Sequence, residues 1–168
     1  MNNKAFTLIE LLGVIIIISI IMVIAIPNVV SVLDKNKKDS YIADAKKLVT
    51  QAQYEIRNGS INKPATGEIV KITLSRLGTS DIKNDPNGDL YNLKDTYVVI
   101  VRKNGYLEYY VNLVANDKNG NNNGISLVNI DKLSEDGKYE LVTTKFELPD
   151  NNKIKQVTGI SGQINIYE

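Results

Sequence analysis

One carboxylate lies at a position where an unpaired negative charge is energetically unfavourable. Glu10 lies at the entrance of an apolar stretch that runs from Ala5 to Leu33. An ionised side chain at the edge of a bilayer core needs a partner, unless it reaches back to water as an interfacial residue. Glu10 is therefore either a functional group with a partner to be identified or a solvated residue at the membrane boundary.

A second set of oxygen-bearing side chains lies in the polar stretch from Asn116 to Gly124. Asp117, Asn119 and Asn121 have the alternating spacing of the ligands in a calcium loop. Only one of the three is a carboxylate, however, and no bidentate Glu follows at the end of the loop. The pattern favours an Asn-rich turn over a calcium site.

The composition excludes most other kinds of catalytic or metal-binding site. The sequence has Cys 0 and His 0, which excludes disulfides, thiol nucleophiles and the commonest metal-binding and acid–base side chains. It also shows no carboxylate pair, phosphate-binding glycine loop or nucleophile beside a base, so we expect neither an enzyme nor a cofactor. The net charge of +1 gives no strong field, and specific binding of nucleic acid is not expected.

The element that carries Glu10 is long enough to cross a membrane. Residues 11–33 carry no charge, and about 20 apolar residues at about 1.5 Å each span a bilayer core. A secretory signal is the alternative, but the basic region has only Lys4 and no small-x-small cleavage triplet follows the apolar run. We therefore expect a transmembrane helix at residues 8–30, interrupted by Pro27.

The segment from Lys4 to Leu12 reads KAFTLIELL and is followed by the apolar run and Pro27. This pattern closely resembles the amino terminus of type IV pilins and of the related pseudopilins. The resemblance covers the amino-terminal third of the chain. Beyond it, only the general architecture is similar. It implies a short basic leader, residues 1–5, which a prepilin peptidase removes on the cytoplasmic face of the membrane.

The resemblance also implies roles for single positions. The cut falls between Ala5 and Phe6, and Phe6 is then N-methylated. Glu10 corresponds to the acidic residue thought to pair with the terminal ammonium of a neighbouring subunit's Phe6, and Pro27 to the family's helix-kinking proline. Two positions depart from the usual pattern, because Ala5 and Ser19 stand where many pilins have Gly.

Partners and location follow from the same resemblance. The implied precursor is a single-pass protein of the cytoplasmic membrane with its amino terminus inside. The implied partners are the prepilin peptidase, the pilus assembly machinery and further copies of the chain in a homopolymeric helical filament outside the cell. The absence of cysteine, together with the richness in Lys, Asn and Ile, resembles chains of low-GC Gram-positive bacteria.

Apolar residues continue at three- and four-residue spacing beyond the span and predict an amphipathic continuation of the helix. Arg57 followed by Asn58-Gly59 predicts its end, so the long helix is expected at residues 6–58. The stripe expected to be buried comprises Tyr41, Ile42, Ala45, Leu48, Val49, Ala52 and Ile56.

Residues 59–95 are punctuated by Pro and Gly and are expected to form a connecting loop, with a brief helix or turn at 68–77 and a turn at 85–89. Beyond them, Asn104-Gly105 separates two β-prone runs and predicts a hairpin of 97–103 with 106–114, in which Lys103 faces Tyr106. The hairpin face expected to pack on the helix comprises Val98, Ile100, Leu107, Tyr109, Val111 and Leu113.

The remaining sequence completes an expected sheet domain at residues 96–168. We expect a loop at 116–124, a short helix at 126–135 capped by Ser126, and further strands at 139–147 and 163–167. The predicted fold class is α+β, in which a long amino-terminal α-helix packs on a small antiparallel β-sheet.

Two classes of function remain. In the first, the chain is a structural pilin polymerised through its amino-terminal helix, or a minor pilin or pseudopilin of a secretion or DNA-uptake system. In the second, it is a solitary membrane-anchored protein whose outer domain binds a small molecule or acts on it. The leader-like amino terminus favours the first.

Overall fold

The computed structural model describes residues 7–78 and 82–168. The chain divides into two compact units, Met1–Asn36 and Lys37–Glu168, and each is considered by itself. The described part of the first unit is the beginning of α1 (Leu8–Arg57), a helix of 50 residues. The rest of α1 belongs to the second unit.

The second unit is built on a six-stranded sheet with the strand order β5-β4-β3-β2-β1-β6. Neighbouring strands are antiparallel except β1 and β6, which are parallel. The strands are β1 (Ile69–Thr73), β2 (Tyr97–Lys103), β3 (Tyr106–Asn116), β4 (Asn122–Asn129), β5 (Val142–Thr144) and β6 (Ile164–Tyr167). The shorter helices are α2 (Leu74–Leu77), α3 (Asn151–Thr158) and the 3₁₀ turns η1 (Ile130–Ser134) and η2 (Lys138–Leu141).

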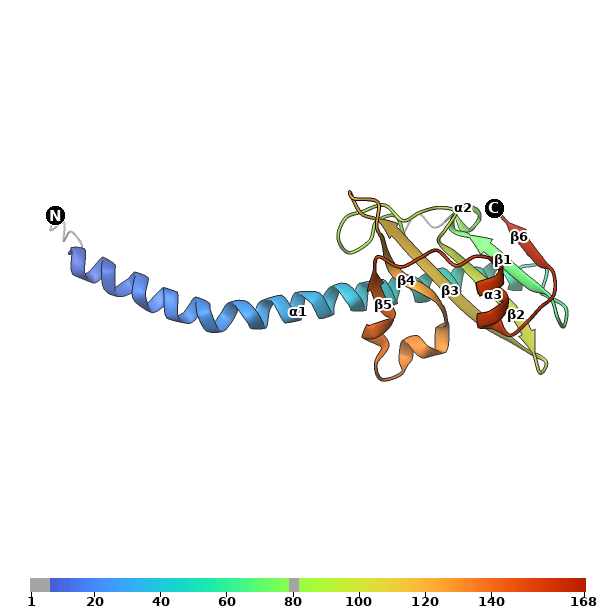
Figure 1. The fold of residues 1–168 in the computed structure, drawn as a ribbon, viewed down its shortest axis with the longest axis horizontal. Coiled ribbons are helices and arrows are strands. Elements are labelled where there is room, and N and C mark those ends of the chain that lie inside the picture. Colours follow the sequence, from blue (N-terminus) through green and yellow to red (C-terminus); the bar gives the residue numbers. More distant parts are fainter. Residues whose placement is uncertain (1–6, 79–81) are drawn as a thin grey trace. The chain divides into compact units, whose positions relative to one another are not determined.

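The second half of α1 covers one face of this sheet (Figure 1). All seven residues of the predicted stripe are buried, and α1 ends at Arg57, just before Gly59 with φ of +80°. The opposing layer contains the predicted hairpin face, with Val98, Ile100, Val111 and Leu113 fully buried. The predicted α+β class, a long helix packed on a mostly antiparallel sheet, is confirmed.

The register of the β2–β3 hairpin is also as predicted. Lys103 pairs with Tyr106, and Asn104 and Gly105 form the connection with φ of 49° and 84°. Positive φ at both turn residues is the requirement of a type I′ turn, which explains why Asn-Gly predicts this structure so well.

The other face of the sheet carries a layer that the sequence analysis missed. Ile154 of α3 is fully buried there against Tyr97, Val99 and Tyr110. Its signals were present in the sequence: Asp150 caps the helix by accepting a hydrogen bond from the Lys153 amide at 2.7 Å, and Gly159 ends it with φ of 68°.

The predictions for residues 116–135 were partly wrong. β3 continues to Asn116 and β4 begins at Asn122, so the loop is shorter than its Asn-rich composition indicated. The segment 126–129 is strand, not helix, and the following turn is capped by Asn129, whose side chain accepts from the Asp131 amide. Pairing with β3 overrides local propensity here, because cross-strand contacts outweigh it.

Three further predictions need correction. Residues 69–73 form strand β1, so only the four residues of α2 are helical in the segment 68–77. In the segment 139–147, only 142–144 is strand. The last strand is present as β6, but it pairs in parallel with β1, a contact between distant segments that local sequence cannot reveal. Gly162 permits it, because a Cβ there would collide with the carbonyl oxygen of Gly67.

Candidate functional site

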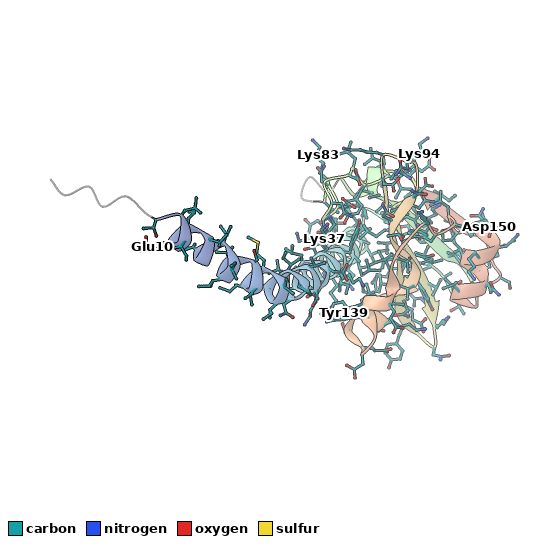
Figure 2. All side chains as sticks on the ribbon, turned by 60° about the vertical axis from the view of Figure 1, so that its left-hand side comes forward. Glu10, Lys37, Lys83, Lys94, Tyr139 and Asp150 are labelled. Carbon is teal, nitrogen blue, oxygen red and sulfur yellow. The ribbon has the colours of Figure 1, made fainter. Side chains whose placement is uncertain are left out.

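Glu10 lies in the first turn of α1 (Figure 2). It makes a capping box with Thr7. Its Oε2 accepts hydrogen bonds from the Thr7 amide at 2.9 Å and from the Thr7 hydroxyl at 2.8 Å, while Thr7 Oγ1 accepts from the Glu10 amide at 3.3 Å. These bonds satisfy amides that the first turn would otherwise leave free. Within the described part of the chain, Oε1 of Glu10 has no hydrogen-bond donor and is available to a further partner.

The helix that follows Glu10 presents apolar side chains that the first unit does not cover. From Leu8 to Leu33 the large apolar side chains are 45–86% exposed. The helix is long and apolar enough to cross a membrane. Such a surface is unfavourable in water, at about 25 cal/mol per Å², so it requires lipid or the helices of other chains.

Pro27 lies within α1, and the helix continues through it. Proline has no amide hydrogen, so it leaves the carbonyl one turn earlier without its helical donor. Polar side chains nearby turn back onto the helix: the Ser19 hydroxyl donates to the Ile15 carbonyl at 2.7 Å, and the Asn28 amide donates to the Ile24 carbonyl at 3.1 Å. Both side chains are therefore hydrogen-bonded to the backbone of their own helix.

Ala5 and Phe6, the predicted cleavage residues, lie outside the described residues, and Phe6 is also a predicted assembly residue. The proposed cleavage and N-methylation sites therefore have no structural description here. The helix that they precede begins at Leu8, with Thr7 as its capping residue.

In the second unit, a polar cluster fastens the connecting loop to α1. Asp85 is 5% exposed and accepts hydrogen bonds from the Tyr41 hydroxyl, from the amides of Asn87 and Asp89 at 2.8 Å each, and from the Asn87 side chain at 3.2 Å. This satisfies a nearly buried carboxylate from both the loop and the helix, as a buried acid requires.

A second contact of the same kind lies beside the first. The Tyr91 hydroxyl donates to Asp44 of α1 at 3.0 Å, and its ring meets that of Tyr41 edge to face with centroids 6.5 Å apart. Burial raises the pKa of Asp44, and burial together with the nearby carboxylates raises the pKa of both tyrosines. At neutral pH both tyrosines are protonated donors. The contacts of Asp85 with Tyr41 and of Asp44 with Tyr91, called the loop clasp below, are therefore structural and offer no acid–base pair.

The weak calcium candidates form a hydrogen-bonded turn. Asp117 Oδ1 accepts from the amides of Asn119 and Asn121 at 2.8 Å each, and Oδ2 accepts from the Asn121 side chain at 2.9 Å. Among the described residues no group of three or more Asp, Glu, His or Cys side chains could hold a metal ion. The turn that the sequence favoured is present.

One comparison with known proteins returned a match. Residues 1–26 match the family model described as a prokaryotic N-terminal methylation motif. The match includes Ala5, Phe6 and Glu10 and ends just before Pro27. No curated protein and no solved structure matches the chain.

Proposed function

We infer that this chain, which carries the class III leader of the type IV pilins and pseudopilins, is a structural pilin that polymerises through its amino-terminal helix. The observation that carries the proposal is the uncovered apolar surface of Leu8 to Leu33 with Glu10 at its entrance. Lipid covers such a surface in the precursor, and the helices of neighbouring subunits can cover it in a filament. The methylation motif points to a structural protein and not to an enzyme.

Leader removal creates the charge that Glu10 needs. A prepilin peptidase cuts between Ala5 and Phe6, and the new terminus at Phe6 is N-methylated and positively charged. A subunit that enters the fibre must bury this ammonium and its own Glu10 among apolar helices, where an unpaired charge costs several kcal/mol. A charge-assisted contact between neighbours offsets part of that cost and sets the stagger of their helices.

The capping box supports this sequence of events. Thr7 holds one oxygen of Glu10, so the carboxylate is oriented at the end of the helix, and among the described residues no donor reaches its second oxygen. A contact from the ammonium of one subunit to Glu10 of another is head-to-tail, and a head-to-tail contact whose rotation does not close a ring propagates as a helix.

This function implies where the protein is located before and after assembly. The precursor is anchored in the cytoplasmic membrane by α1 with its amino terminus inside, and the assembled subunit is extracellular. A minor pilin or a pseudopilin of a secretion or DNA-uptake system would assemble through the same helix. Long surface filaments that contain this chain as their main subunit distinguish the pilus from these alternatives.

Variants of Glu10 test the proposal. Glu10→Ala and Glu10→Gln, each expressed as the only copy, should reach the membrane and lose their leader but yield at least tenfold fewer sheared filaments, since one lost charge pair is worth about 1.5–3 kcal/mol. Ser19→Ala is the matched control, because the Ser19 hydroxyl donates to the Ile15 carbonyl of its own helix and Ser19 carries no charge. Wild-type filament yield from both Glu10 variants would remove Glu10 from the mechanism.

The amino terminus of the native protein separates a pilin from a solitary membrane-anchored protein. Mass spectrometry of the mature chain should find an N-methylated Phe6. An intact Met1 in the functional protein would contradict the proposed processing and favour the solitary protein.

A further inference from the structure

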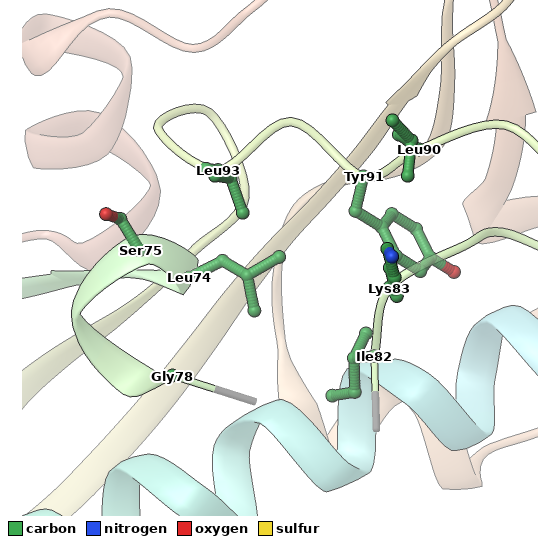
Figure 3. A pocket seen from close by; sticks show the side chains of 8 residues that line it. All are labelled: Leu74, Ser75, Gly78, Ile82, Lys83, Leu90, Tyr91 and Leu93. Carbon is green, nitrogen blue, oxygen red and sulfur yellow. The ribbon is translucent and has the colours of Figure 1, made fainter. Parts of the chain in front are cut away.

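Two hollows of the second unit differ in the charge of their walls. The hollow beside α2 is lined mainly by apolar side chains such as Leu74 and Leu93, and among the described residues of its wall Lys83 is the one with a charge (Figure 3). The other hollow, called the basic groove below, lies between the end of α1 and strand β3 and has a volume of about 230 Å³. The residues that line the basic groove are Gln53, Ile56, Arg57, Lys63, Leu107 and Tyr109.

Three cations from three different segments surround the basic groove. Arg57 is the last residue of α1, Lys63 belongs to the connecting loop, and both line the groove. Arg102 of β2 lies beside them, because it pairs directly with Leu107 and its Nε donates to the Pro64 carbonyl at 3.1 Å. Residues that face each other across two strands share one face of the sheet. The groove therefore lies in a locally positive field.

These cations are not neutralised by the part of the chain that the structure describes. The ion pairs found there do not include Arg57, Lys63 or Arg102. Each of the two arginines uses its Nε to donate to a backbone carbonyl, which for Arg57 is the carbonyl of Gln53 at 3.3 Å. The terminal nitrogens of both guanidinium groups therefore remain available as donors.

Three carboxylates lie close to these cations in the sequence, but each has another partner. Glu55 is 4.0 Å from Arg76, and Glu68 accepts a hydrogen bond from a backbone amide of its own loop at 3.0 Å. Glu108 is 3.1 Å from Lys103 and belongs to the face of the sheet that α3 covers. Like charges that converge without a counter-charge repel one another, so a bound anion would relieve this repulsion.

Apolar surface forms the rest of the basic groove. Ile56 is buried on its floor, and Leu107 and Tyr109 are half-buried. Burial raises the pKa of Tyr109, against the opposing effect of the nearby Arg57 charge, so its hydroxyl is protonated at neutral pH. A flat ring next to cations can receive the carbon part of an anionic ligand, while its hydroxyl can donate to an oxygen.

We propose that the basic groove binds a small organic phosphate. The phosphate group lies among Arg57, Lys63 and Arg102, and the carbon part of the ligand packs on Leu107 and Tyr109. This site belongs to the second unit and uses no residue of the apolar span, so it does not depend on the proposed filament.

The charge and the size of the groove favour this class of ligand. A phosphate monoester carries a charge of about −1.5 to −2 at pH 7, which matches three cations better than the single charge of a carboxylate does. Guanidinium groups also match the geometry of phosphate oxygens. Pockets for drug-sized ligands measure about 300–1,000 Å³, so the smaller basic groove suits one phosphate with a short chain or a single ring.

Calorimetric titration of the full chain in non-ionic detergent tests the site, with phenyl phosphate as the probe in about 0.1 M salt. We expect saturable binding with a dissociation constant below about 1 mM. Inorganic phosphate, which lacks the ring, and phenyl sulfate, which carries less charge, should both bind more weakly. Phenol, which has the ring and no anion, should not compete.

Variants that remove one cation test which residues hold the phosphate. Arg57→Gln, Lys63→Gln and Arg102→Gln should each weaken the binding of phenyl phosphate about tenfold, since each loses a charge-assisted contact. Lys46→Gln is the matched control, because it removes one exposed cation of α1 that lies about 16 Å from Arg57 along the helix, beyond the screening length of about 10 Å. Its affinity should stay within twofold of wild type.

Lys63→Gln keeps the test decisive if an arginine variant fails to fold, because Lys63 is exposed and makes no ion pair with the described residues. Loss of affinity in this variant but not in Lys46→Gln supports the site. Equal affinity of wild type, Lys63→Gln and Lys46→Gln would overturn it, and so would a wild-type chain that shows no saturable binding at millimolar phenyl phosphate. Phenol that competes as well as inorganic phosphate would overturn the assignment to a phosphate.

Discussion

At the scale of single residues, the loop clasp shows how a polar cluster fixes a long connection. Asp85 accepts hydrogen bonds from a helix tyrosine and from two amides of its own loop, and it is nearly buried. The turn around Asp85 was predictable from Asp-Pro and Gly. The contact with Tyr41 was not, because 44 residues separate the partners in the chain.

Removing the Tyr41 hydroxyl should destabilise the outer domain. In a fragment that lacks residues 1–33, Tyr41→Phe leaves the Asp85 carboxylate without one donor and should lower the free energy of unfolding by about 1–3 kcal/mol. Tyr139→Phe is the control, since Tyr139 bonds to Asp39 in an exposed position and its loss should cost less than about 1 kcal/mol. Equal denaturant midpoints for the two variants would show that the clasp contributes nothing.

Asp44 should give the same domain an unusual dependence on pH. Burial raises the native pKa of Asp44 above the unfolded value of about 3.9, so between these values the native state binds a proton that the unfolded chain has released. The stability that Asp44 contributes is therefore greatest at low pH and declines as pH rises through this window.

Asp44→Asn should remove this decline. The variant keeps an oxygen for Tyr91 but carries no charge, so its stability relative to wild type should increase as pH rises through the window. Urea titrations of both proteins at several acidic pH values measure the difference, with Asp131→Asn as an exposed control for the loss of one negative charge. A constant difference between Asp44→Asn and wild type at all these pH values would contradict the predicted role of burial.

At the scale of elements, the core is formed by two periodic patterns of apolar residues, one in a helix and one in a hairpin. The helix stripe recurs every three to four residues and the hairpin face every two, and the structure buries both in one cluster. The hairpin register was predictable because its turn is local. β4 was misread as loop and helix because its Asn and Gly residues are poor strand formers, and α3 was missed although its caps were present.

Shortening a buried side chain on either side of this core should lower the stability of the domain. Leu48 of α1 and Val111 of β3 are both fully buried in the shared cluster. In the fragment that lacks residues 1–33, Leu48→Ala and Val111→Ala should each lower the free energy of unfolding by about 2–4 kcal/mol. Lys46→Ala, on the exposed side of the same helix, should change it by less than about 0.5 kcal/mol. Unchanged midpoints for both core variants would show that the two faces do not pack together.

At the scale of the whole molecule, α1 contributes to two units, and its apolar side chains are exposed in one and buried in the other. Its first part exposes apolar side chains, and its second part supplies the core of the sheet domain. Only the first part demands lipid or neighbouring helices. Assembly and stability of the domain should therefore be separable.

The fragment that lacks residues 1–33 should show this separation. It should be folded, soluble and monomeric at micromolar concentration, because the core of the second unit is complete without the apolar span. Size-exclusion chromatography and thermal unfolding followed by circular dichroism measure both properties. A fragment that forms filaments without the span would contradict polymerisation through the amino-terminal helix.

The sequence by itself determined the parts of this protein that are encoded locally. The charge-free apolar run, the segment around Glu10, the helix stripe and the Asn-Gly hairpin each depend on residues that are close in the chain, and the structure contains the helix and the hairpin as predicted. Only the tertiary structure decided the parallel pairing of β6 with β1, the second layer formed by α3 and the loop clasp. The physical reason is that these features join segments far apart in sequence, whose meeting depends on the packing of the whole sheet and leaves no local periodicity.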